Sequence, residues 1–214
     1  MLGGIVPVNH LHPHLLVSAR FDIRVRGRRH NKFGQCGVKD QSSQPHQIPI
    51  PARATAIAAG FRFSAILDER GRVWTFGSNS FGELNRQIEG KTSPEPGLAY
   101  ADEPVVQMSC GWFHLCAVTS RGRLISWGRN NYGQCGEQDK LEDIRAESVS
   151  CGSEHTVFLS TSKALGTFGW NEHGQLGRSG DSSEHIHFPH FDRRVLTAAS
   201  GGSHTLALTH PRQH

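Results

Sequence analysis

Residues 110–136 read CGWFHLCAVTSRGRLISWGRNNYGQCG and contain three short motifs in a fixed order. The first is Gly-x-x-His, the second ends in an aromatic residue followed by Gly, and the third is Asn-x-x-Gly-Gln-x-Gly. The glycine that opens the first motif recurs at spacings of 51, 41 and 49 residues, at Gly60, Gly111, Gly152 and Gly201. A recurring period of this length indicates a repeat architecture.

The other two motifs recur in register with the first one. The second motif occupies residues 71–77, 122–128 and 163–169, and the third occupies residues 31–37, 79–84, 130–136 and 171–177. Alternate positions after the first motif are mostly apolar, namely 65/67, 116/118, 157/159 and 206/208. One apolar face at a spacing of two predicts a strand in each repeat.

A second strand is predicted after each of these strands. Gly71 and Gly122 end the four-residue links, and glycine readily adopts the left-handed conformation of a tight hairpin. Lys163 takes this place in the third copy, which we expect to strain the turn or change its type. Each repeat is therefore a small antiparallel sheet that cannot bury both faces alone. Stacking such sheets around an axis gives a β-propeller.

The wording of the motifs adds a family resemblance over residues 31–210. Gly-x-x-His-Thr together with Trp-Gly-x-Asn-x-x-Gly-Gln-x-Gly resembles the repeat of the regulator of chromosome condensation family. Residues 149–155 and 169–174 are similar to the last blades of one exchange factor in that family. The resemblance implies an all-β, seven-bladed propeller, of which this chain is similar to the C-terminal half.

The number of blades leaves two architectures. Residues 31–214 suffice for about three and a half blades of roughly 50 residues each. Either the chain is an open arc of a seven-bladed ring, or residues 21–25 pair with the strand at Leu206 and close a four-bladed ring. Blades shaped for seven meet at about 51° and a ring of four needs about 90°, so we favour the open arc. An open arc exposes two blade faces, which predicts low stability or association.

The charge divides the chain into two parts. The net charge is +4 overall, but residues 1–32 hold six Lys and Arg against one Asp. We predict a basic, poorly ordered arm at residues 1–30 and the partial propeller at residues 31–214. The arm is a candidate for weak contact with nucleic acid. Glycines and a proline within residues 2–8 argue against a secretory signal, and no apolar run reaches the roughly 18 residues of a membrane helix.

The histidines outside the repeat motif form two clusters. They are His10, His12 and His14 near the N-terminus, and His185, His187 and His190 near the C-terminus. Neither cluster has a cysteine or carboxylate that completes a four-ligand pattern, so we interpret them as surface-loop residues and predict no metal.

The histidine of the first motif has a structural interpretation. It recurs at His114, His155 and His204, but Phe63 replaces it in one copy. Because Phe can neither ligate a metal nor transfer a proton, we predict that this histidine hydrogen-bonds the backbone of its own blade.

The cysteines and one break in the third motif complete the pattern. Five cysteines fall in repeat columns and are interpreted as small buried residues, at positions 36, 110, 116, 135 and 151. Their odd number without Cys-x-x-Cys favours a reducing compartment, cytoplasm or nucleus. Glu83 and Asn85 replace Gln and Gly of the third motif. This break is either local decay or a charged contact for a partner on an exposed turn.

No residue pattern outside the repeat indicates chemistry. The chain has no phosphate-binding loop and no nucleophile motif. We predict no catalytic, cofactor-binding or metal residues, no enzyme activity, no small-molecule substrate and no membrane partner.

The family resemblance implies a guanine nucleotide exchange factor-like regulator or adaptor for a small GTPase, which acts through propeller loops. The alternatives are a non-catalytic interaction scaffold and a chromatin-associated protein that uses the basic arm. Four aromatic loop residues either anchor a partner or pack between blades, namely Trp112, Phe113, Tyr132 and Trp170.

Overall fold

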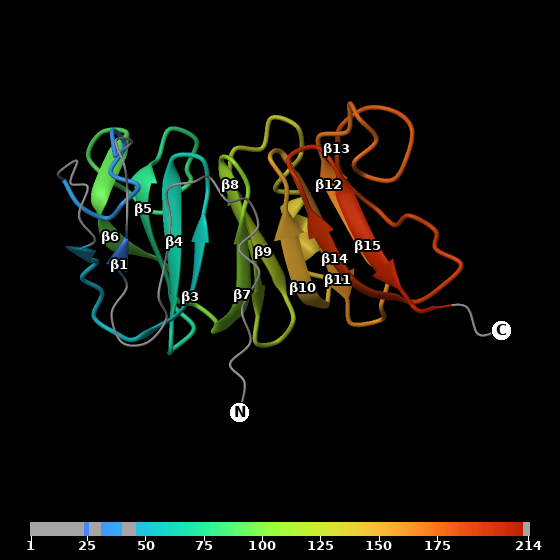
Figure 1. The fold of residues 1–214 in the computed structure, drawn as a ribbon, viewed down its shortest axis with the longest axis horizontal. Helices are drawn as coiled ribbons and strands as arrows, with labels where there is room; N and C mark the ends of the chain where they lie inside the picture. The colour runs from blue at the N-terminus through green and yellow to red at the C-terminus, as the bar shows by residue number, and fades with distance from the viewer. Residues whose placement is uncertain (1–23, 26–30, 40–45, 212–214) are drawn as a thin grey trace.

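The computed structural model describes residues 24–25, 31–39 and 46–211. This part of the chain forms fifteen β strands and one short helix, α1 (Gln138–Leu141). The prediction of a disordered arm at residues 1–30 lies outside the described residues, apart from Arg24 and Val25. The all-β class and the partial propeller are confirmed (Figure 1).

Three antiparallel sheets succeed one another along the chain. Blade 1 has the order β3-β4-β5-β6, blade 2 the order β7-β8-β9, and blade 3 the order β10-β11-β12-β13. The strands of blade 1 are β3 (Ala54–Ala59), β4 (Phe63–Asp68), β5 (Val73–Ser78) and β6 (Thr92–Tyr100). Those of blade 2 are β7 (Val105–Cys110), β8 (His114–Thr119) and β9 (Leu124–Gly128). Those of blade 3 are β10 (Ala146–Cys151), β11 (His155–Ser160), β12 (Leu165–Gly169) and β13 (Ser183–His187).

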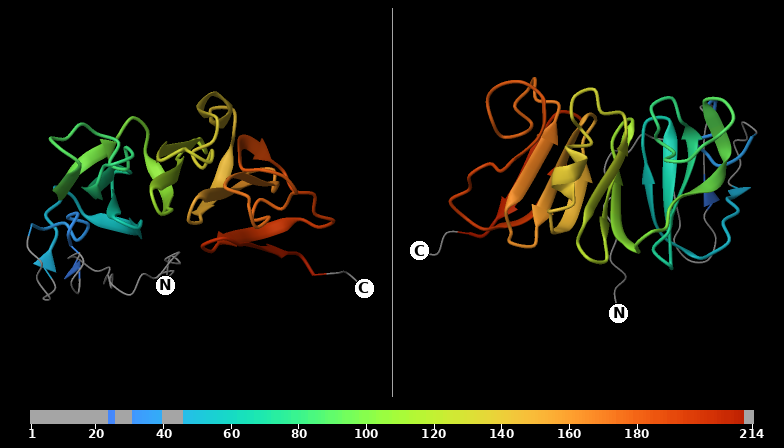
Figure 2. Two further views of the ribbon diagram at one scale, coloured as in Figure 1. Left: turned by 90° about the horizontal axis from the view of Figure 1, so that it is seen from above. Right: turned by 180° about the vertical axis from the view of Figure 1, so that it is seen from behind.

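The two ends of the arc carry incomplete blades. β1 (Arg24–Val25) pairs with β2 (His46–Gln47) at one end. β14 (Val195–Ser200) pairs with β15 (Thr205–Thr209) at the other end and forms the last hairpin. Seen from above, the blades fan along an open arc with these two pairs at its ends (Figure 2). The alternative of a closed four-bladed ring is therefore wrong, because Arg24 and Val25 pair with Gln47 and His46 instead of the Leu206 strand.

The core lies between successive blades. Ala65 and Leu67 of blade 1 pack in one buried cluster with Val105 and Leu115 of blade 2. The same two columns are buried in the next two blades, at Cys116 and Val118 and at Val157 and Leu159. The alternation of strand side chains therefore gives each blade one face for the blade before it and one for the blade after it.

The prediction of two bare blade faces is right at only one end. At the front of blade 1, Ile66 and Phe76 pack with Cys36 and Ile48, so residues 31–39 and 46–50 cover this face. At the last hairpin, Leu206 and Leu208 keep 67% and 59% exposure, whereas the equivalent residues of the other blades are at most 4% exposed. The third motif alone did not reveal the covering segment, because residues 38–50 carry no repeat pattern.

The glycine of the first motif stands where a side chain has no room. A Cβ on Gly111 would lie 2.1 Å from Cε1 of His114 and 2.5 Å from the carbonyl oxygen of Gly152 in the next blade. The loops of successive blades are joined there by backbone hydrogen bonds. Phe61 N–H donates to the Trp112 carbonyl at 3.0 Å, and Trp112 N–H donates to the Ser153 carbonyl at 2.9 Å.

Candidate functional site

The loops of the first and third motifs lie at the same rim of the arc. β5 runs antiparallel to β4 and pairs Gly77 with Phe63, so the turn after β5 meets the loop before β4. The same pairing holds in the other complete hairpins, with His114 opposite Gly128 and His155 opposite Gly169. These loops form the upper edge of the molecule in Figure 1.

Aromatic and arginine side chains make a continuous series of contacts along this rim. Arg62 lies 4.5 Å from the Phe33 ring centre and 5.1 Å from that of Phe61. The distance between ring centres is 5.7 Å for Phe61 and Trp112, 5.6 Å for Phe61 and Phe113, and 5.3 Å for Phe81 and Phe113. We call this set the aromatic rim: Phe33, Phe61, Arg62, Phe81, Trp112, Phe113, Arg129, Tyr132, Trp170 and His173.

The second half of the aromatic rim is organised around Arg129. Its guanidinium lies 5.1 Å from the ring centre of Phe81 and 5.5 Å from that of Tyr132. The ring centres of Tyr132 and Trp170 lie 6.3 Å apart, and those of Trp170 and His173 lie 5.0 Å apart. Rings from the turn at residues 31–37 and from all three blades therefore lie on one surface.

A buried carboxylate holds Arg129 in place. Arg129 Nη1 donates to Glu154 Oε1 at 3.0 Å, and the Gln134 amide donates to Glu154 Oε2. Burial raises the pKa of Glu154, although Arg129, His114 and Gln134 favour its charged form. This pair therefore restricts the conformational freedom of the Arg129 side chain.

The predicted aromatic anchors are both packed and exposed. Trp112 and Tyr132 keep 43% and 37% exposure, and each contacts a ring from a neighbouring blade, Phe61 and Trp170 respectively. Their role in binding a partner stays a prediction. Phe33 and Phe81 were missed, although an aromatic column in the third motif (Phe33, Phe81, Tyr132, His173) is visible in the sequence.

The structure contradicts one of the two interpretations of Glu83 and the predicted backbone hydrogen bonds of the motif histidines. Glu83 is fully buried, and its carboxylate accepts hydrogen bonds from Phe81 N–H and Ser78 Oγ, so it is not an exposed partner contact. His114 and His155 face threonines of the next blade instead of backbone of their own blade. Blade stacking, which the sequence does not show directly, creates both environments.

The histidines and cysteines outside this rim offer little chemistry. His185 and His187 lie on strand β13, so the prediction of loop positions is wrong for them, while His190 follows the strand. Residues 24–25, 31–39 and 46–211 contain no group of three His, Cys, Asp or Glu side chains that could hold a metal ion. His10, His12 and His14 lie outside the described residues. All five cysteines are free and buried, as predicted, and burial raises the pKa of Cys135 to about 12.

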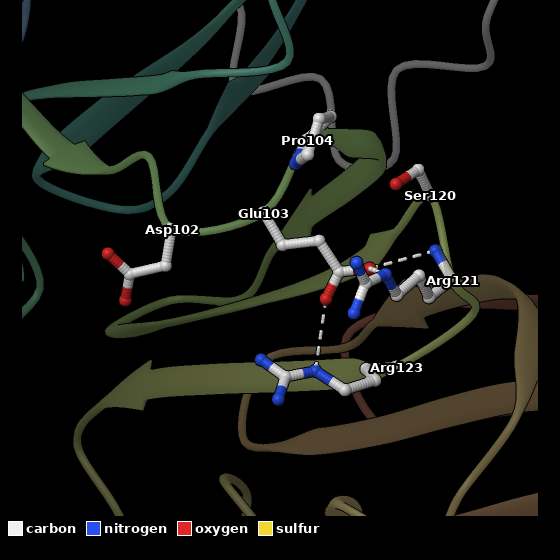
Figure 3. A pocket seen from close by; sticks show the side chains of 6 residues that line it. All are labelled: Asp102, Glu103, Pro104, Ser120, Arg121 and Arg123. Carbon is white, nitrogen blue, oxygen red and sulfur yellow. Dashed lines mark hydrogen bonds and ion pairs between the residues drawn. The ribbon is translucent and has the colours of Figure 1, made fainter.

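A polar cavity of about 470 Å³ lies at the opposite rim (Figure 3). Glu103 Oε1 accepts the Arg121 N–H at 2.9 Å, and Glu103 Oε2 lies 3.1 Å from Arg123 Nε. Although burial raises the pKa of Glu103, hydrogen bonds and the two arginines bring it below its usual range. The charges of Glu103, Arg121 and Arg123 in this cavity are paired with one another, so the aromatic rim is the better candidate for binding a partner.

An arc of short antiparallel blades with motif-bearing loops at one rim defines a repeat protein of the β-propeller class. The chain matches two family models described as regulator of chromosome condensation (RCC1) repeat. One matches residues 54–83, 105–134 and 146–175, and the other matches residues 70–118, 121–159 and 167–208. The chain belongs to this family.

The chain is similar to proteins with different named activities. It is 32% identical over 198 residues to the ultraviolet-B receptor UVR8 of Arabidopsis thaliana, covering 83% of this chain and 44% of that protein. It is 29% identical over 203 residues to the secretion-regulating guanine nucleotide exchange factor of Mus musculus, covering 78% and 44%. This second likeness confirms the similarity expected from residues 149–155 and 169–174.

A solved structure shows the same fold. Prp20p from Saccharomyces cerevisiae superimposes with a TM-score of 0.74 at 17% identity, over 94% of this chain and 57% of that chain. The study of that structure describes its binding properties to Gsp1p and histones. This chain spans about half the length of the curated relatives it matches.

Proposed function

We propose that this chain binds a small GTPase through the aromatic rim and acts as an exchange factor-like regulator or adaptor. The observation that carries the proposal is the continuous row of aromatic and arginine side chains across the blades. Trp, Tyr and Arg dominate the binding energy of protein interfaces. The similarity to a guanine nucleotide exchange factor supports the choice of a GTPase as the partner.

Nucleotide exchange requires no bond making by the regulator. It requires a surface that binds the nucleotide-free GTPase more tightly than the loaded one. Linkage then makes nucleotide and regulator weaken each other by the same factor. An aromatic surface without catalytic groups is sufficient for such a role.

The test is the release of labelled GDP from a panel of small GTPases at micromolar concentrations of this chain. We expect faster release from one of them, and Trp112→Ala should reduce the effect at least tenfold. The backbone of Trp112 carries its hydrogen bonds to neighbouring loops, so this variant should stay folded. Phe191→Ala is the matched control, because Phe191 is an exposed aromatic residue outside the aromatic rim. If no GTPase in the panel responds, the exchange activity is excluded.

A non-catalytic interaction scaffold is the second candidate function. The different activities of the similar proteins favour it, because one fold hosts many functions. In that case the aromatic rim would hold a protein whose binding does not change with GDP. A pull-down with and without GDP, repeated with Trp112→Ala, separates the two candidates.

Location and contact with nucleic acid also belong to this proposal. Five free cysteines support the cytoplasm or the nucleus as the compartment. No helix in the described part of the chain is long and apolar enough to cross a membrane. Weak contact with DNA stays a prediction for residues 1–30, outside the described residues. Removing those residues should abolish any retention of the chain on DNA.

A further inference from the structure

The outer strand of blade 1 departs from the regular ladder at residues 94–96. β6 pairs Ser93 with Gly77 and Gly97 with Thr75, so three residues of β6 face a single residue of β5. Two of these three residues are prolines, which have no N–H to donate to the ladder. Because β6 is an edge strand of its sheet, this bulge lies on the outside of blade 1.

Arg86 lies against this bulge. Its Nη2 donates to the Ser93 hydroxyl at 2.9 Å, to the Glu95 carbonyl at 3.0 Å and to the Thr75 carbonyl at 3.3 Å. A Cβ on Gly97 would lie 2.4 Å from both Nε and Cζ of Arg86, so glycine at this position makes room for the guanidinium. The fold therefore holds a guanidinium directly beside the Ser93 hydroxyl.

No carboxylate of the described residues forms an ion pair with Arg86. The acceptors of its Nη2 are neutral oxygens, and its Nε is buried without a hydrogen-bond partner. The carboxylate of Glu95, on the same bulge, pairs with Lys39 at 3.0 Å instead. Burial lowers the pKa of Arg86, as it does for a cation whose charge is not balanced. This position thus has a fixed positive charge that lacks an anion.

The corresponding serine of blade 3 has different surroundings. β13 pairs Ser183 with Gly169, as β6 pairs Ser93 with Gly77. The Ser183 hydroxyl accepts the N–H of His185 at 3.0 Å, and a glutamate follows it in the sequence. The combination of serine, arginine and proline is therefore a feature of blade 1, and Ser183 offers a matched control.

The sequence around Ser93 is that of a kinase substrate. Ser93 is followed by Pro94, and no other serine or threonine of the 214-residue chain is followed by proline. Proline-directed protein kinases require a proline at this position. Ser93 is half-buried, while Thr92 and Glu95 on either side of the Ser93-Pro94 pair are exposed.

We propose that Ser93 is a phosphorylation site for a proline-directed protein kinase and that Arg86 holds the phosphate group. Ser93 Oγ attacks the γ-phosphorus of ATP, the bond from that phosphorus to ADP breaks, and the hydroxyl proton passes to the kinase. A phosphoserine carries about −1.5 to −2 charges at pH 7 and accepts strong hydrogen bonds from a guanidinium. Phosphorylation therefore supplies the anion that Arg86 lacks.

This site lies next to one end of the aromatic rim. A Cβ on Gly34 would lie 2.5 Å from Cα of Pro94, so the turn that carries Phe33 packs against the residue after Ser93. A kinase reaches Ser93 when this packing opens locally, and edge elements with few buried contacts open at a lower free energy than the core. The phosphate then ties the bulge of β6 to Arg86, beneath the turn of Phe33.

The first experiment treats the full chain with ATP and a mitogen-activated protein kinase, a class that requires only the serine-proline pair. Mass spectrometry of the digested chain should find one phosphate, on Ser93. Ser93→Ala and Pro94→Ala should each reduce the incorporation at least tenfold, and Ser183→Ala should leave it unchanged. Absence of phosphate on Ser93 in the treated chain would overturn the proposal.

The second experiment tests the role of Arg86 without a kinase. Phosphoserine is incorporated during translation at residue 93 or at residue 183, and the melting temperature is compared with that of the unmodified chain. Phosphoserine at residue 93 should raise the melting temperature by about 2–4 °C, whereas phosphoserine at residue 183 should not raise it. In the Arg86→Gln background the rise should disappear.

A second background keeps this comparison valid if Arg86→Gln fails to fold. Arg86→Lys keeps the charge but loses the planar fork of donors, so the rise in melting temperature should be smaller than with arginine. The same rise in the Arg86 variants as in the original chain, or a lower melting temperature with phosphoserine at residue 93, would overturn the role of Arg86. No GTPase takes part in these measurements, so their outcome is independent of the function proposed above.

Discussion

Nε2 of His114 in blade 2 lies 2.9 Å from Oγ1 of Thr156 in blade 3. The Thr156 hydroxyl donates to the Gln134 carbonyl at 2.8 Å, so its oxygen accepts the hydrogen bond from His114 Nε2–H. His155, Thr205 and Gln175 repeat this arrangement one blade later. One threonine therefore connects the first and third motifs of the preceding blade.

The first prediction concerns that hydroxyl group. Thr156→Val keeps the shape of the side chain but leaves the His114 imidazole and the Gln134 carbonyl without their partner. We expect a loss of about 2 kcal/mol in the free energy of unfolding, measured by urea denaturation. Thr161→Val, in an exposed turn, is the control and should change stability by less than about 0.5 kcal/mol. Equal effects of the two variants would show that the hydroxyl has no special role.

The second prediction concerns Lys163, which has a φ of 68° where Gly71 and Gly122 have 74° and 78°. The turn therefore keeps the left-handed conformation that favours glycine, and Lys163 is strained in it. Strain, and not a change of turn type, is the outcome of the two that the sequence left open. Lys163→Gly should raise the free energy of unfolding by about 0.5–1 kcal/mol, because the left-handed region costs about 1–2 kcal/mol for other residues. The ion pair of Lys163 with Glu147 is partly exposed and offsets little of this gain.

The reverse substitution is the control for the second prediction. Gly122→Lys should destabilise the chain by about 1 kcal/mol in the same thermal or urea unfolding experiment. If Lys163→Gly instead lowered stability, the contact with Glu147 would outweigh the backbone strain.

The repeat pattern predicted the strands because alternation and turn glycines act locally. Residues such as Leu67 and Val118 were placed on the buried face of their strands from the alternation of apolar positions alone. Contacts between blades were not predicted, because residues such as His114 and Thr156 are 42 positions apart and meet only through stacking. The covering residues 38–39 and 46–50 were missed for the same reason.

The candidate site was predicted in part. Trp112 and Tyr132 were named as candidate anchors because aromatic residues contribute much of the binding energy of protein interfaces. Arg62 and Arg129 were not named from the sequence, because other residue types occupy the same repeat positions. Their place in the aromatic rim depends on contacts with neighbouring rings. The sequence shows that residue 83 is a glutamate in place of a glutamine. It does not show that this side chain is buried, because burial depends on how the blades pack.

Glu83 leads to the third prediction. A glutamine occupies this position in the other copies, and its side-chain oxygen accepts the same N–H, as Gln134 does from Tyr132 at 2.9 Å. Glu83→Gln should therefore change the free energy of unfolding by less than about 0.5 kcal/mol, whereas Glu83→Ala should lose about 2 kcal/mol because Phe81 N–H loses its acceptor. Thermal unfolding of both variants measures the difference. A large loss with Gln would mean that the negative charge itself is required.

Asp68 is the most completely bonded carboxylate of blade 1. Its Oδ1 accepts the backbone N–H of Arg70 and Arg72 at 2.9 and 3.0 Å. Its Oδ2 accepts Arg72 Nε at 2.8 Å and the Trp74 indole at 2.9 Å. Burial raises the pKa of Asp68, but these hydrogen bonds outweigh burial and bring the pKa below its usual value.

The fourth prediction follows from that lowered pKa. The folded chain holds the Asp68 proton less tightly than the unfolded chain, so the carboxylate stabilises the fold above the unfolded pKa of about 4. This contribution disappears as the pH falls through the lower, folded pKa. Asp68→Asn should therefore cost about 2 kcal/mol at pH 7, where bonds to the charged group are complete, and less at pH 3. Urea denaturation at both pH values measures this, with Asp102→Asn in an exposed turn as the control. A cost that does not change with pH would show that the shape of the side chain, and not its charge, stabilises the turn.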